Sequence, residues 1–147
     1  MYRRWGTVTA VVTDLLAEMA VESVARTETG TLAGDLRANA RLVLRTLTDR
    51  RQGPLFKAVL AAATCDDATA TALADFYAAR IAEWAPCVTQ AVERGEAPAG
   101  TDAAAVVMAV SAPLYYRLLT GTGALDEEAA DRAAAAAVAA TKAGVFC

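Results

Sequence analysis

The side chains that could perform nucleophilic or acid–base chemistry are few and poorly matched to one another. The chain has no histidine, and its three cysteines, Cys65, Cys87 and Cys147, are widely spaced. Without histidine, the Ser-His and Cys-His nucleophile systems and most zinc sites are excluded. Ser111 has no base that the sequence places beside it. We therefore expect no enzyme, no metal site and no cofactor, and we expect reduced thiols instead of disulfides.

Two adjacent carboxylates could be taken for a metal or acid–base pair. Asp66 and Asp67 follow Cys65 at the start of a predicted helix. Aspartates at this position more often cap the free backbone N–H groups and offset the helix dipole. We therefore interpret the pair as a helix cap.

The bulky and adaptable side chains point to ligand binding. They gather in three segments, two of which contain an interior proline. These side chains are Phe56, Phe76, Tyr77, Trp84, Met108, Tyr115 and Tyr116. Helices bent at a proline pack imperfectly and can leave a cavity, and ligand pockets are mostly apolar. Each residue taken singly is more often plain core. Taken together, however, they predict a ligand pocket, which we expect to be lined by Phe56, Leu60, Tyr77, Trp84, Met108, Ser111 and Tyr115. Ser111, Tyr115 and Gln90 are the candidate hydrogen-bonding groups.

A central helix from Asp102 to Gly121 is expected to position much of this pocket. It starts at a Thr101/Asp102 cap signal, ends at a glycine, and contains Pro113 in its interior. One apolar stripe is formed by Val106, Val110, Leu114 and Leu118, and further apolar residues widen it past half the surface. Because a helix that is apolar on several sides has several partners, we predict that one face lines the interior and another contacts a second copy.

Five further helices follow from apolar residues at helical spacing. They cover approximately residues 8–24, 31–48, 54–64, 66–94 and 126–144, and the fourth contains Pro86. The last is rich in alanine, which lets a neighbouring helix approach closely, although an exposed tail is an alternative. Arg37, Arg41 and Arg45 form a basic row along the second, for which acidic side chains of the same chain are better partners than DNA.

Composition is typical of one soluble all-α domain. The 147 residues are 56% hydrophobic but only 6% aromatic, so alanine carries the excess. We expect no membrane span and no signal peptide, and therefore a cytoplasmic protein. The net charge of −3 argues against nucleic-acid binding by the chain as it stands. The charge is unevenly distributed, because the N-terminal third is basic. This part is either a solvated surface of mixed charge or a side that faces DNA in a longer protein.

Several short segments resemble the tetracycline-repressor (TetR) type of transcription factor. They are Ser111–Leu119, preceded by Glu93–Glu96 and followed by Gly121–Asp126, and at the start Tyr2–Trp5. The last resembles the end of that family's DNA-recognition helix, so Tyr2 and Arg3 are the remnant of a DNA-binding surface. The family's Pro-Ser-Lys-Glu pattern after the tryptophan is replaced here by Gly6–Thr9, which leaves its phosphate contact in doubt.

The resemblance implies a regulatory domain that senses a small hydrophobic effector and forms a homodimer through a four-helix bundle. Residues 1–5 are then the end of a helix-turn-helix headpiece, and residues 6–147 the ligand-binding and dimerisation domain. Operator DNA is a partner of the full-length protein only. We place the dimer interface at Val106, Val110, Leu114, Ala133 and Ala137. A stand-alone helical dimeric interaction module, and more remotely a small-molecule carrier or enzyme, are the alternatives.

Overall fold

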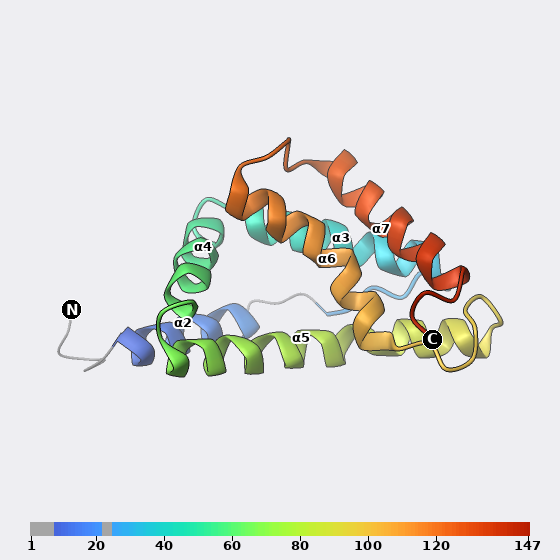
Figure 1. Ribbon diagram of the computed structural model, residues 1–147, viewed down its shortest axis with the longest axis horizontal. Helices are drawn as coiled ribbons and strands as arrows, with labels where there is room; N and C mark the ends of the chain where they lie inside the picture. The colour runs from blue at the N-terminus through green and yellow to red at the C-terminus, as the bar shows by residue number, and fades with distance from the viewer. Residues whose placement is uncertain (1–7, 22–24) are drawn as a thin grey trace.

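The computed structural model describes residues 8–21 and 25–147, which form six helices and no strand (Figure 1). The helices are α2 (Val8–Val21), α3 (Leu32–Thr48), α4 (Gln52–Ala63), α5 (Asp67–Glu93), α6 (Ala103–Thr120) and α7 (Glu127–Lys142). The predicted all-α fold of about six helices is confirmed. Pro86 and Pro113 both lie inside continuous helices, so neither ends its helix, as expected.

Side-chain caps begin four of these helices at the positions that the sequence indicated. Thr31, Asp66, Asp102 and Asp126 each accept a hydrogen bond from the backbone N–H three residues further on, at 2.8–3.1 Å. Such caps satisfy N–H groups that have no partner within the helix. The interpretation of Asp66 as a cap is therefore confirmed. Gly121 ends α6 with a φ of 66°, a left-handed conformation that glycine adopts without strain.

The six helices enclose one main core (Figure 1). The long helix α5 runs along one side of the molecule, α6 lies in front of α3, and α7 packs against both α3 and α6. The core between them contains fully buried side chains from α3, α5 and α6: Leu32, Leu36, Val88, Val106, Val110 and Leu114. Burying each of these aliphatic side chains contributes roughly 1.5–3 kcal/mol.

The five residues expected at a dimer interface lie inside their own chain. Val106, Val110 and Leu114 are 0% exposed, and Ala133 and Ala137 are 5% and 4% exposed. The apolar stripe of α6 faces the main core, and the small side chains of α7 bring that helix close against α3 and α6. This burial corrects the expectation that these side chains contact a second copy. The surface that α6 leaves exposed carries Met108, Tyr116 and Leu119 instead.

A carboxylate on α7 joins two arginines of α3. Asp131 accepts hydrogen bonds from Nε of Arg37 and of Arg41, at 3.0 and 2.8 Å, and from a terminal nitrogen of each. Arg41 also lies 3.6 Å from Glu127. For these two arginines, the expectation of acidic partners from the same chain is confirmed.

Helix α2 packs on the rest of the molecule through a second, smaller cluster. Val12 and Leu16 of α2 contact Val59 of α4 and Leu73 of α5. Phe76 and Tyr77 pack against both this cluster and the main core. An ion pair between Glu18 and Arg51, at 3.0 Å, lies at the surface of the same contact. The position of α2 therefore depends on α4, α5 and the aromatic side chains between them.

Among the described helices, α6 is long and apolar enough by length and composition to cross a membrane. The core helix of a soluble protein meets the same criterion, and α6 buries Val106, Val110 and Leu114 in the core.

Candidate functional site

A cavity of about 590 Å³ lies between α2, α3, α4, α5 and α6. Its volume falls in the range of pockets that bind drug-sized molecules. All seven residues predicted to form a ligand pocket line it: Phe56, Leu60, Tyr77, Trp84, Met108, Ser111 and Tyr115. The structure therefore brings these side chains together around one space. Their role in binding stays a prediction.

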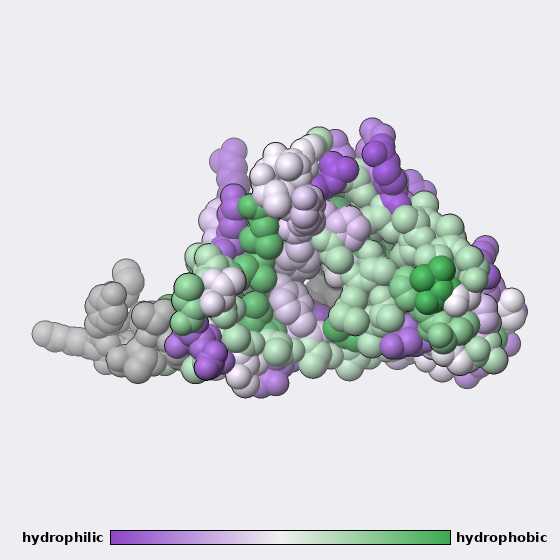
Figure 2. Space-filling model, viewed as in Figure 1, coloured by the Kyte–Doolittle hydropathy of each residue, from purple (hydrophilic) through white to green (hydrophobic). Residues whose placement is uncertain are grey.

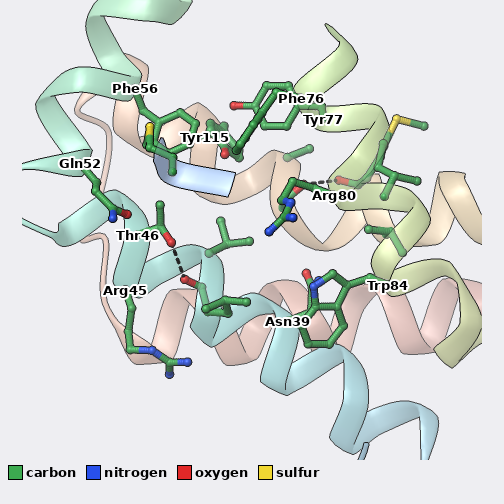
Figure 3. Close-up of a pocket in the computed structure, with 18 of the residues that line it drawn as sticks. Asn39, Arg45, Thr46, Gln52, Phe56, Phe76, Tyr77, Arg80, Trp84 and Tyr115 are labelled. Atoms are coloured by element: carbon green, nitrogen blue, oxygen red, sulfur yellow. Dashed lines mark hydrogen bonds between the residues drawn. The ribbon is translucent and has the colours of Figure 1, made fainter. Parts of the chain in front are cut away.

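Four aromatic rings form one wall of the cavity (Figure 3). Phe56 of α4 lies 5.7 Å from Phe76 of α5 and 6.4 Å from Tyr115 of α6, between ring centroids. Tyr77 lies 5.4 Å from Phe76 and 5.6 Å from Tyr115, with the rings close to perpendicular. Edge-to-face pairs of this kind are attractive beyond the area they bury. The wall therefore couples three helices through ring contacts.

Two tyrosine hydroxyls lie in this wall. The Tyr77 hydroxyl is buried and has no hydrogen-bond partner among the described residues. Burial raises the pKa of Tyr77 above its usual range, and the neighbouring Tyr115 adds to the effect. Burial also raises the pKa of Tyr115 to about 12. Both hydroxyls therefore remain protonated at neutral pH.

Three charged residues line the cavity: Arg45, Asp49 and Arg80. Arg80 of α5 points into the space in Figure 3, where its guanidinium lies 3.0 Å from the Glu83 carboxylate and 5.9 Å from the centre of the Phe76 ring. Arg45 and Asp49 line the cavity near the end of α3. Hydrogen bonds from the backbone N–H groups of Gln52 and Arg51, at 2.8 and 2.9 Å, lower the pKa of Asp49.

Helix α3 contributes a wall that the sequence did not indicate. Asn39, Leu42, Val43, Arg45 and Thr46 line the cavity, and Met19 of α2 adds an apolar contact. Asn39 is only 4% exposed, and its Oδ1 has no hydrogen-bond partner among the described residues. The available signal was position, since Asn39 lies directly beside the buried stripe that contains Leu36 and Ala40.

Other residues singled out by the sequence lie away from the cavity. Gln90 and Tyr116 are not among its lining residues, and Tyr116 is 63% exposed. Tyr2 and Arg3 fall outside the described residues. The Cys87 thiol is fully buried, and burial, with Asp35 nearby, raises its pKa to about 11. Within residues 8–21 and 25–147, no three potential metal ligands come together.

The chain is similar to known regulatory domains over most of its length. Residues 26–137 match the family model described as the tetracyclin repressor-like C-terminal domain. The crystal structure of the TetR family transcription regulator SCO0332 superposes with a TM-score of 0.79 at 22% sequence identity, covering 94% of this chain and 76% of that one. At this identity, the structural match is a likeness of fold. A comparison with curated proteins found no match.

Proposed function

This chain belongs to the family of tetracyclin repressor-like C-terminal domains, regulatory parts of transcription factors, and we propose that it senses a small hydrophobic molecule. The observation that supports this proposal is the cavity of about 590 Å³, lined mainly by aromatic and aliphatic side chains from five helices. The ligand-binding residues in this proposal are Phe56, Leu60, Tyr77, Trp84, Met108, Ser111 and Tyr115. We propose no catalytic role, and we propose that the protein is cytoplasmic.

A ligand in the cavity can change the position of α2, because a few side chains connect the cavity to that helix. Met19 of α2 lines the cavity directly, and Leu60, Phe76 and Tyr77 contact both the cavity and the cluster that holds α2. A ligand that fits one packing of these side chains better than another shifts the population toward that packing. In the proposed mechanism, the resulting movement of α2 repositions a DNA-binding segment on its N-terminal side, so that the protein releases or binds its operator.

The same proposal includes a homodimer that buries the outer faces of α6 and α7. Met108, Tyr116 and Leu119 are 49%, 63% and 50% exposed on α6. On α7, Ala135, Ala136 and Ala139 are exposed, and Ala135 and Ala139 line a groove beside α3. In Figure 2, the side of α7 and of the start of α6 turned to the viewer is mostly pale green, whereas the end of α6 is white to pale purple. Two α6–α7 pairs from two chains form a four-helix bundle around a two-fold axis.

In the same scheme, residues 1–5 are the end of a recognition helix, with Tyr2 and Arg3 among its DNA-facing residues. Residues 6–147 form the ligand-binding and dimerisation domain. Repression is the proposed direction of control. The chain as given then has no specific affinity for DNA, because a complete helix-turn-helix is needed to place side chains in the major groove.

Fluorescence of Trp84 tests ligand sensing. Trp84 is only 4% exposed and lines the cavity, and Trp5→Phe leaves it as the sole tryptophan. We expect hydrophobic molecules from a broad library to change its emission in a saturable way. Ser111→Phe, which places a ring in the cavity, should abolish the response, whereas Thr89→Phe, at an exposed position of α5 outside it, should not. No response from any library member would contradict the proposal.

A further inference from the structure

Polar side chains line the cavity where α3 ends and α4 begins. Arg45 and Asp49 line it there and are exposed, so the cavity meets solvent at this end. Thr46 and Gln52 line the same end. In Figure 3, Arg45 lies on the side of the drawn site away from the four-ring aromatic wall. The cavity therefore combines an apolar interior with a polar rim, which is formed by Arg45, Thr46, Asp49 and Gln52.

Arg45 carries a positive charge that the described residues leave without a direct partner. Its side chain makes no ion pair or hydrogen bond with any of them, unlike the other two arginines of the basic row on α3, which pair with Asp131. Asp49 lies one turn further along, but its carboxylate accepts hydrogen bonds from two backbone N–H groups at the start of α4, at 2.8 and 2.9 Å. Arg80 also lines the cavity, but it lies 3.0 Å from Glu83. A carboxylate placed beside Arg80 is therefore repelled by Glu83, whereas Arg45 is available to an anion.

We propose that the effector is an amphipathic anion, a hydrophobic molecule with a carboxylate at one end. Its apolar body lies against the aromatic wall, and its carboxylate pairs with Arg45 at the polar rim. This inference rests on the proposed ligand-sensing function and specifies the ligand class for the same cavity. The guanidinium of an arginine keeps its charge at physiological pH and can donate two parallel hydrogen bonds to a carboxylate.

The position of Arg45 at the rim avoids the cost of burying the carboxylate. An ion moved fully into an apolar interior loses its hydration, and a single ion pair does not offset that loss unless further donors replace the water. At the rim the carboxylate stays partly hydrated, while the apolar body leaves water for the cavity. An ion pair that is exposed to water contributes little affinity. We therefore expect the apolar body to supply most of the affinity and Arg45 to select the head group.

Three matched probes test the ligand class with the chain carrying Trp5→Phe. They are para-octylbenzoate, para-octylphenol and para-octylbenzylamine, which are anionic, neutral and cationic at neutral pH. Affinities are measured by titration of the Trp84 emission and by calorimetry, below the concentrations at which the probes form micelles. We expect the benzoate to bind about twofold to fivefold more tightly than the phenol, the effect of one partly exposed ion pair, and the amine to bind most weakly. Salt at about 0.5 M should reduce the advantage of the benzoate, because salt screens exposed charges.

Two substitutions of Arg45 test its role. In Arg45→Gln the benzoate should lose its advantage over the phenol, and in Arg45→Glu the amine should bind more tightly than the benzoate. Arg50→Gln is the matched control, because it removes the same charge from an exposed position that does not line the cavity. This control should keep the preference for the benzoate. Circular dichroism establishes that the variants fold, and the order of the three probes in wild type tests the proposal even if one variant does not.

The outcomes separate this inference from the proposed function. If the phenol binds wild type as tightly as the benzoate, or the amine binds best, the inference is overturned while ligand sensing stands. If the preference for the benzoate survives in Arg45→Gln, or is lost equally in Arg50→Gln, the carboxylate does not pair with Arg45 and the inference is again overturned. If none of the three probes binds, the inference fails, and the proposed function fails with it when the broad library is also silent.

Discussion

Asp131 holds α7 against α3 through two arginines. The carboxylate accepts hydrogen bonds from Arg41 and Arg37, and both arginines lower its pKa, with Arg41 having the larger effect. A carboxyl group whose pKa is lower in the folded chain than in the unfolded chain stabilises the fold while it is ionised. This contribution is fully present above the unfolded pKa of about 4. It is lost as the pH falls from there toward the lower folded value.

We therefore predict that Asp131→Asn lowers the melting temperature at pH 7 and weakens the dependence of stability on pH below about 4. Thermal unfolding followed by circular dichroism across this pH range measures both effects. Glu128→Gln is the control, because Glu128 lies one turn earlier on α7, is 78% exposed and pairs only with Arg132 among the described residues. Equal losses of melting temperature in the two variants would show that the pairing of Asp131 with Arg37 and Arg41 adds no more stability than an exposed ion pair does.

Helix α6 has one buried face and one exposed face. Leu114 is 0% exposed in the core, whereas Leu119, on the outer face, is 50% exposed. We predict that Leu114→Ala lowers the free energy of unfolding by about 2–5 kcal/mol, because it leaves a cavity in a packed core. Leu119→Ala should change it by no more than about 0.5 kcal/mol. Urea unfolding at a protein concentration low enough for the monomer measures both, and similar losses would contradict this assignment of faces.

The two faces of α6 also show how far the sequence could predict the structure. Helix starts were predictable because a cap depends on residues three positions apart, as for Asp102 and Ala105. The grouping of Val106, Val110 and Leu114 on one face was also correct, because it follows from 3.6 residues per turn. Which neighbour that face meets was not predictable, since α6 is apolar on several sides. The stripe assigned to a second subunit is the core stripe.

The pocket was predictable in part for a related reason. Large aromatic residues such as Tyr77, Trp84 and Tyr115 are the side chains expected around an apolar cavity, and all of them line it. For Asn39, the two sequence signals disagreed: its position beside the Leu36 and Ala40 stripe favoured burial, whereas a polar residue on an amphipathic helix is usually expected to face solvent. Its burial depends on α5 and α6 packing over that side of α3. Such long-range packing is not encoded in local spacing.

The cavity and the proposed dimer surface share residues of α6. Met108 lines the cavity and is 49% exposed, and Ala112, one turn further along α6, also lines the cavity and is exposed. A second copy that packs on the outer face of α6 therefore covers the edge of the cavity. In that case, dimerisation and ligand binding are linked, and each strengthens the other by the same factor.

Leu119→Glu tests this linkage, because it places a charge on the outer face of α6, away from the cavity lining. We expect sedimentation equilibrium to show a dimer for wild type and a weaker dimer for the variant. The affinity for the hydrophobic probe para-octylphenol, measured by Trp84 emission, should fall by about fivefold or more. Thr122→Glu, at an exposed position in the loop after α6, should change neither quantity. A weaker dimer with unchanged affinity would mean that the partner does not cover the cavity. A monomeric wild type would contradict the proposed homodimer, and its ligand affinity would not depend on protein concentration.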